Sequence, residues 1–181
     1  MAHWYAYIYE QQEDEHELIA CVKQMLGDAP LRILEPACDD GKLCVPPAQA
    51  GHDVTGFAMD EAMLQFAYAK AEHLPNLHIQ QADMLATNWW HGFDAVLLCA
   101  NLMVNIQTDW DDYKQAQKKL LDNARNALRP GGHLLLTLTA RIRSKRSVAR
   151  VNGFVLKAVM TRAPMVATSS FPARSTHRRG R

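Results

Sequence analysis

Residues 31–60, LRILEPACDDGKLCVPPAQAGHDVTGFAMD, are the part of this sequence that most restricts how the chain can fold. A short apolar run at 31–34 leads into a turn of small residues at 36–41, and a segment of helical length then ends at Gly51. A second apolar run follows at 54–57. Strand, tight loop, helix and strand within about 30 residues are typical of a βαβ unit, whose parallel strands are joined by a right-handed crossover. The sequence therefore predicts an open α/β sheet with a ligand cleft outside the carboxyl ends of its strands.

Four short sequences carry a resemblance to a known family. The loop EPACDDG at 35–41 is similar to the E/D-x-G-x-G-x-G loop of class I S-adenosylmethionine-dependent methyltransferases, with the last glycine kept, Ala37 at the first glycine position and Asp39 at the second. QADM at 81–84, FDAV at 93–96 and LRPGG at 128–132 match later motifs of the same family. The resemblance covers about residues 1–140. It implies a doubly wound, mostly parallel sheet of the Rossmann-like methyltransferase fold, with S-adenosyl-L-methionine as the cofactor.

The resemblance also implies a cofactor site built from strand ends and the loops that follow them. The small-residue loop would let the backbone approach the methionine part of the cofactor, and the start of the next helix would offer amide donors to its carboxylate. In the family, an apolar residue packs on the adenine ring, an aspartate bonds its amino group, and the end of the fourth strand lines the cleft. The implied cofactor-binding residues are Glu35, Ala37, Cys38, Asp39, Gly41, Ala58, Met59, Asp60, Asp83, Met84, Cys99 and Asn101.

This sequence departs from the family pattern at three of these positions, Ala37, Asp39 and Ala58. Asp39 stands where the family has a glycine; if this position needs a positive φ, aspartate can adopt it at some cost, and its charge would lie near the cofactor's carboxylate. The strain alone is expected to lower affinity by about 1–2 kcal/mol. Ala58 stands where the family has an acidic residue that accepts hydrogen bonds from the ribose hydroxyls. Losing a charged acceptor typically costs about 1.5–3 kcal/mol.

Two aspartates each have two interpretations. Asp60 either caps the helix predicted at 61–73 or takes over the ribose in place of Ala58. Asp83 either caps a turn or bonds the adenine amino group, with the amide of Met84 meeting the ring.

The rest of the first 140 residues follows helical and strand patterns. Apolar residues at helical spacing predict a helix at 13–26 ended by Gly27, and this helix either covers an edge of the sheet or follows a lid over the cofactor formed by Tyr5 and Tyr9. Two prolines at 46–47 predict a short or kinked helix after the first loop. The remaining predicted elements are strands at 76–79, 93–101 and 133–139 and a helix at 110–128.

Beyond residue 140 the pattern stops matching the family. The basic tail, 141–181, holds eleven of the twenty Lys and Arg residues and none of the nineteen Asp and Glu residues, so residues 1–140 carry a net charge of −10. We expect incomplete or altered C-terminal strands, one strand or short helix at 151–160 and a disordered end at 169–181. The tail is either unrelated to the fold or an arm that binds nucleic acid or another polyanion in a salt-sensitive way. The predicted division is thus a methyltransferase-like domain at 1–140 and a basic tail at 141–181.

Several classes of protein are excluded by what the sequence lacks. It has no apolar run of membrane-spanning length and no secretory leader pattern at its start. The four cysteines form no CxxC pair, which favours free thiols in the cytoplasm, and the histidines show no metal-ligand spacing. The N/D-P-P-Y/F motif of amino-methylating DNA enzymes is absent. A nicotinamide dehydrogenase would need G-x-G-x-x-G after the first strand, where this loop has one glycine.

We therefore expect an enzyme that transfers a methyl group from S-adenosylmethionine to a small molecule or, as a second choice, to a protein. Catalysis in such enzymes comes mainly from alignment and electrostatics, so no catalytic base is assigned. The alternative is a non-catalytic methyltransferase-like binding module, with the tail as a nucleic-acid arm. An unsealed sheet edge would favour a homodimer.

Overall fold

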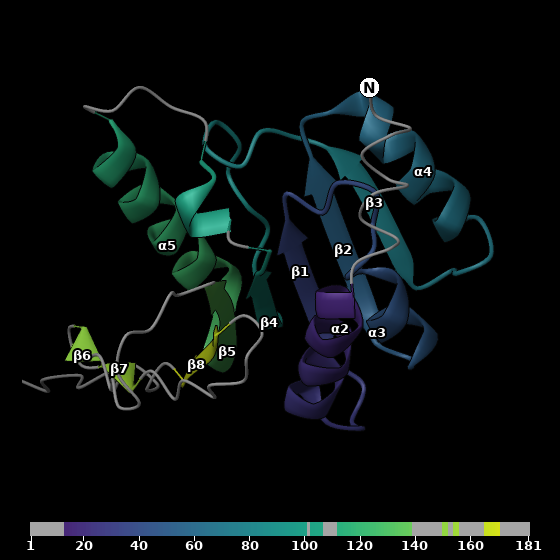
Figure 1. Ribbon diagram of the computed structural model, residues 1–181, viewed down its shortest axis with the longest axis horizontal. Helices are drawn as coiled ribbons and strands as arrows, with labels where there is room; N and C mark the ends of the chain where they lie inside the picture. Colours follow the sequence, from purple (N-terminus) through teal and green to yellow (C-terminus); the bar gives the residue numbers. More distant parts are fainter. Residues whose placement is uncertain are drawn as a thin grey trace, which may run out of the picture.

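The computed structural model describes residues 13–100, 102–106 and 112–138, together with three short strands in the segment beyond them. Within this part of the chain, six strands form one sheet in the order β3-β2-β1-β4-β5-β8 (Figure 1). Strands β1 to β5 all pair in parallel, and β8 pairs antiparallel with β5. The strands are β1 (Arg32–Pro36), β2 (Asp53–Ala58), β3 (Leu77–Gln81), β4 (Phe93–Leu98), β5 (Leu128–Leu138) and β8 (Met165–Ser170). This is the predicted doubly wound, mostly parallel α/β sheet.

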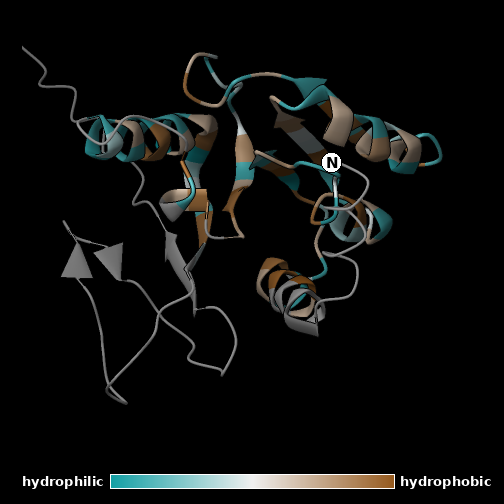
Figure 2. Ribbon diagram, turned by 45° about the horizontal axis from the view of Figure 1, so that its top comes forward, coloured by the Kyte–Doolittle hydropathy of each residue, from teal (hydrophilic) through white to brown (hydrophobic). Residues whose placement is uncertain are grey.

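Helices cover both faces of the sheet. On one face α2 (Glu13–Leu26), α3 (Val45–Gln49) and α4 (Glu61–Ala71) pack through Val22, Ala48 and Leu64 against the strands. On the other face lies α5 (Tyr113–Ala127), preceded by the short 3-10 helix η1 (Leu102–Val104). Figure 1 shows α5 on one side of the strands and α2, α3 and α4 on the other. The buried side of α5 consists of Ala116, Leu120, Ala124 and Ala127, and Figure 2 shows hydrophilic residues on the same helix.

Local sequence explains most element boundaries. Helix α2 ends at Leu26, before Gly27 with φ of 73°, as predicted. Helix α3 is only five residues long and carries the two prolines, which confirms the predicted short helix. Strand β5 begins five residues earlier than predicted, since Leu128 already pairs with Phe93 and the extra residues before His133 are absorbed in a bulge.

The C-terminal segment differs from the expectation in one respect. Residues 169 and 170, which the composition placed in a disordered end, belong to β8, which pairs with β5 from His133 to Leu138. The rest of that end, 171–181, lies outside the described residues. One strand or a short helix was predicted at 151–160. At 150–155 the structure describes an antiparallel pair of two-residue strands, β6 (Arg150–Val151) and β7 (Phe154–Val155), and the other residues of 151–160 lie outside the described part of the chain.

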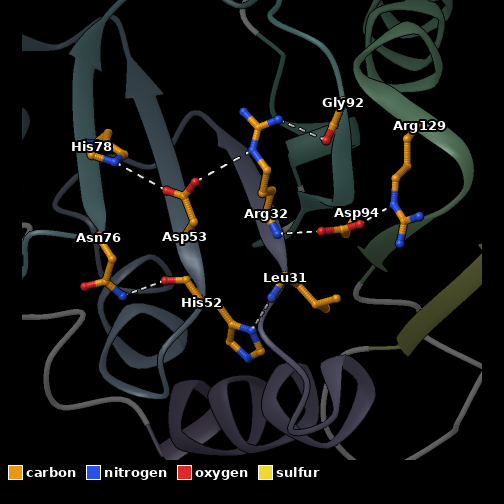
Figure 3. Close-up of polar contacts among 9 residues, drawn as sticks. All are labelled: Leu31, Arg32, His52, Asp53, Asn76, His78, Gly92, Asp94 and Arg129. Atoms are coloured by element: carbon orange, nitrogen blue, oxygen red, sulfur yellow. Dashed lines mark hydrogen bonds and ion pairs between the residues drawn. The ribbon is translucent and has the colours of Figure 1, made fainter.

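Polar contacts tie the amino ends of the strands together (Figure 3). Arg32 in β1 pairs with Asp53 in β2 at 3.7 Å, and His78 in β3 lies 3.3 Å from the same carboxylate. Asp94 accepts a hydrogen bond of 2.7 Å from the backbone N–H of Arg32 and pairs with Arg129. Most of these side chains are about half exposed, so each ion pair stabilises the fold only modestly. The loops considered below lie at the opposite, carboxyl edge.

Candidate cofactor-binding site

The carboxyl ends of β1 and β2 lie side by side. Glu35 pairs with Gly56 and Pro36 with Phe57 in the parallel register. The backbone N–H of Cys38 then donates a 3.1 Å hydrogen bond to the carbonyl of Phe57. The loop after β1 is therefore fixed against the end of β2, as the prediction of one shared cleft requires.

The backbone of this loop adopts the conformation that the family's glycines would favour. Ala37 has φ of 56°, Asp39 has φ of 46° and Gly41 has φ of 76°. The position of Asp39 thus does need a positive φ, the case in which a cost was expected, and Ala37 shares it. Non-glycine residues in this region are strained by about 1–3 kcal/mol each, so surrounding contacts must hold the loop in place. Gly41 is tightly enclosed, because an added Cβ would lie 3.1 Å from the Cβ of Ala67 in α4.

The start of α3 differs from the expected source of amide donors. The N–H groups of Cys44 and Val45 donate to the carbonyl of Gly41 at 3.0 Å each. Pro46 and Pro47, the next residues, have no N–H at all. The first turn of this helix therefore has few free amide donors to offer a carboxylate.

Glu35 is buried beneath the loop, and the Cys44 thiol donates a 2.8 Å hydrogen bond to its Oε2. Burial raises the pKa of Glu35 from 4.5 to about 8; the hydrogen bond from Cys44 lowers it, and the nearby carboxylates of Asp39 and Asp40 raise it further. Burial likewise raises the pKa of the Cys44 thiol. Near neutral pH, Glu35 is thus held mainly in its uncharged form.

This burial makes the stability of the protein depend on pH. The folded pKa of Glu35 lies above its unfolded value, so its contribution is fully present below about pH 4.5 and is lost as the pH rises towards about 8. Glu35→Gln keeps the shape of the uncharged side chain and removes the titratable carboxyl group. In urea unfolding between pH 5 and 8, wild-type stability should fall relative to that of Glu35→Gln as the pH rises. A stability difference that stays constant over this range would contradict the assignment.

Asp39 is the second carboxylate of the loop whose pKa is shifted. Partial desolvation in the loop raises its pKa from 3.8 to about 6, and the charges of Asp40 and Asp60 add to this. The side chain itself remains exposed to solvent. Screening by water therefore keeps the effect of this shift on stability small.

The end of β2 presents one buried and one exposed apolar side chain. Ala58 is 3% exposed, whereas Met59 is 65% exposed. Asp60 caps α4, because its Oδ1 accepts hydrogen bonds from the N–H groups of Ala62 at 2.9 Å and Met63 at 3.4 Å. Of the two roles open to Asp60, the structure shows the cap. A strand-end carboxylate for the ribose is therefore missing at position 58.

The loop after β3 is organised by Asp83. Its Oδ1 accepts hydrogen bonds from the N–H groups of Leu85 at 2.7 Å and Ala86 at 3.3 Å, so the turn-capping role is present. The next residue, Met84, is half-buried, and its carbonyl accepts hydrogen bonds from Trp89 Nε1 at 3.0 Å and Asn123 Nδ2 at 3.2 Å.

Sequence reasoning did not identify Trp89 and Asn123 as supports of this loop. The tryptophan pair just before β4 was a signal for a buried aromatic contact. Nothing in the sequence indicated that Asn123 of α5 would reach across to a loop 39 residues earlier.

The end of β4 is described only in part. Cys99 is buried, and Ala100 has φ of 53°. Among the described residues, Ala100 is therefore the third non-glycine residue in the left-handed region, after Ala37 and Asp39. Sequence reasoning missed Ala100, because alanine gives no local sign of a positive φ. Asn101 lies outside the described residues, as do Tyr5 and Tyr9.

Two further observations concern the described residues alone. Cys38, Cys44 and Cys99 are buried, and none of them is in a disulfide. In the same part of the chain, no three His, Cys, Asp or Glu side chains gather closely enough to hold a metal ion, and no helix is both long and apolar enough to cross a membrane.

Comparisons with known proteins agree with this geometry. A family model described as a methyltransferase domain matches residues 33–132, more than half of the chain. YqeM of Bacillus subtilis (strain 168), a protein named as a methyltransferase, is 35% identical over 81 residues, which cover 44% of this chain and 33% of YqeM. The match thus spans about a third of that relative's length.

Solved structures show the same fold. The glycopeptide N-methyltransferase MtfA, in a crystal structure with (S)-adenosyl-L-methionine, superimposes with a TM-score of 0.62 at 17% identity, covering 90% of this chain and 68% of MtfA. A TehB-like SAM-dependent methyltransferase from Corynebacterium glutamicum ATCC 13032 gives a TM-score of 0.63 at 18% identity. The superposition covers 92% of this chain and 93% of the TehB-like chain. With residues 33–132 matched by the family model and the sheet of this fold, the chain belongs to the methyltransferase-domain family of class I S-adenosylmethionine-dependent methyltransferases.

Proposed function

We propose that this chain binds S-adenosylmethionine across the carboxyl ends of β1 and β2 and takes part in methyl transfer to a small-molecule acceptor. The observation that carries the proposal is the loop at 36–41. It alternates left-handed residues at Ala37, Asp39 and Gly41 and is bonded to the end of β2 through Cys38 and Phe57. Such a loop lets backbone atoms approach a ligand closely at the point where the strand ends converge.

The residues fit the cofactor at both of its ends and less well in the middle. The backbone of the loop would hold the methionine part, and the exposed Met59 would pack on the adenine, with Asp83 and Met84 at the ring edge. The ribose lacks its usual acceptor, because Ala58 has no carboxylate and Asp60 Oδ1 is engaged by α4. The cofactor supplies the methyl group, and this chain supplies alignment and exclusion of water. The buried free thiols suit the reducing cytoplasm, where we propose that the protein acts.

Isothermal titration with S-adenosylmethionine and S-adenosylhomocysteine tests the binding step. We expect measurable heat and a raised Tm with both ligands, at weaker affinity than in relatives that keep the ribose acceptor. Absence of heat and of a thermal shift at millimolar ligand would refute the proposal.

Asp39 offers a way to separate strain from charge. The φ of 46° at Asp39 belongs to the folded loop, so its strain lowers the stability of the fold. Asp39→Gly should raise the free energy of unfolding by about 1 kcal/mol. Asp39→Asn keeps a side chain that tolerates this φ and removes the charge near the cofactor's carboxylate. It should tighten binding about threefold while changing stability little.

Urea unfolding and titration of both variants measure these two effects. Unchanged stability in Asp39→Gly would contradict the strain argument. Weaker binding in Asp39→Asn would contradict the proposed orientation of the carboxylate.

A second candidate function is a non-catalytic binding module. Ala58 and the two prolines in α3 favour it, because each removes a group that would hold the cofactor. Incubation with methyl-labelled cofactor and a panel of small-molecule acceptors separates the two functions. Label transfer with release of S-adenosylhomocysteine would overturn the module, whereas binding without turnover on any acceptor would support it.

A further inference from the structure

The cofactor loop lies in a group of four carboxylates. Asp39 and Asp40 raise the pKa of Glu35, after its burial, and Asp40 and Asp60 raise that of Asp39. Glu35 is mainly uncharged near neutral pH, so the repulsion that a nearby cation would relieve is that among the aspartates. Lys70, two residues before the C-cap residue Glu72 of α4, provides such a cation.

Lys70 contacts both the side chain and the backbone of Asp40 in the loop. Its Nζ lies 2.7 Å from Oδ2 of Asp40 and donates a second hydrogen bond, at 3.0 Å, to the backbone carbonyl of Asp40. Asp40 is buried, and about a third of the Lys70 side chain is exposed. An ion pair with one buried partner and a backbone bond fixes position as well as charge.

One turn earlier in α4, Ala67 packs against the same loop. The space where Gly41 would carry a Cβ is taken by the Cβ of Ala67 at 3.1 Å and its Cα at 3.3 Å. Ala67 and Lys70 lie on the same face of the helix, at i and i+3. Helix α4 therefore holds two consecutive loop residues, one by packing and one by charge.

We propose that Lys70 is a positioning residue for cofactor binding, which clamps the loop at 37–41 to α4 through Asp40. Ala37 and Asp39 are strained in the left-handed region and would relax without an external hold. The clamp keeps their backbone groups where the methionine part of the ligand would meet them. This inference rests on the proposed function of the site.

Four variants and one control test the clamp: Lys70→Met, Lys70→Arg, Asp40→Asn, the double variant Lys70→Met/Asp40→Asn, and Lys118→Met. Lys118 also forms a lysine–aspartate ion pair, with Asp122, and both side chains are exposed on α5. Lys118→Met therefore removes the same kind of ion pair at a place away from the loop. Each chain is titrated with S-adenosylmethionine and S-adenosylhomocysteine. Amide hydrogen exchange of Gly41, whose N–H bonds to the Cys38 carbonyl at 2.8 Å, reports loop order without a ligand.

Lys70→Met should weaken binding of both ligands about tenfold, since the loss is one of position and not of charge recognition. It should also speed exchange at Gly41. Lys70→Arg should restore affinity to within about threefold, and Lys118→Met should change neither readout. The double variant should bind no worse than either single variant, because Lys70 acts through Asp40.

Additive losses in the double variant, or unchanged exchange at Gly41 in Lys70→Met, would overturn the clamp. So would a Lys70→Met chain that binds as tightly as the wild type. A wild type that binds neither ligand would overturn the proposed function and, with it, the role of Lys70 in binding. The exchange measurement would then show whether Lys70 orders the loop at all, so the two failures are distinguishable.

Discussion

Replacing Trp89 with alanine should lower the free energy of unfolding by about 3–5 kcal/mol, the usual range for deleting a large buried aromatic side chain. Trp89 is 6% exposed and meets Phe57 edge to face, with ring centroids 5.6 Å apart. Its Nε1 also donates to the carbonyl of Met84 at 3.0 Å. One side chain thus joins the end of β2 to the loop proposed for the adenine, and its loss should weaken cofactor binding as well.

Two matched variants separate packing from the hydrogen bond. Trp89→Phe keeps an aromatic ring and loses the N–H, so it should cost about 1–2 kcal/mol. Trp90→Ala removes the neighbouring tryptophan, which also meets Phe57 edge to face but is 36% exposed, and should cost less than Trp89→Ala. Urea unfolding followed by circular dichroism measures all three. Equal losses for Trp89→Ala and Trp90→Ala would show that Trp89 has no special place in the core.

Gly56→Ala should lower the free energy of unfolding by about 2–3 kcal/mol through overpacking. A Cβ at Gly56 would lie 2.6 Å from the sulfur of Cys44, 3.0 Å from that of Cys38 and 3.0 Å from Cδ1 of Ile79. The two cysteines belong to the loop and to the start of α3, so the methyl group would push the loop away from the strand ends. Cofactor affinity should therefore fall about tenfold or more.

A double variant tests whether the sulfur is the obstacle. Gly56→Ala combined with Cys44→Ala conserves volume at the contact, so the pair should be at least about 1 kcal/mol more stable than the sum of the single losses predicts. Gly51→Ala is the comparison for cofactor affinity: Gly51 has a positive φ, so alanine there should cost stability through backbone strain, but nothing lies within 4 Å of its missing Cβ and affinity should not change. Strict additivity of the two single losses would locate the strain elsewhere.

The helices and strands were predicted from local sequence patterns. The predictions were accurate where an element depends only on its own residues. The apolar runs at 31–34 and 54–57, with a turn of small residues between the first strand and the helix, sufficed for the βαβ unit. The positive φ at Asp39 followed from its place in a glycine pattern. The start of β5 was displaced, because pairing of Leu128 with Phe93 through a bulge is a property of two strands together and not of the LRPGG segment.

By itself the sequence determined the order of strands and helices, the family and the edge of the sheet where a ligand would bind, because these follow from periodicity and turn residues along short stretches. Only the tertiary structure decided what supports that edge: the thiol of Cys44 on Glu35, Trp89 beneath Met84 and Lys70 on Asp40. These contacts arise when separate elements pack on one sheet. Their partners are chosen by shape and distance in space, which no local pattern encodes.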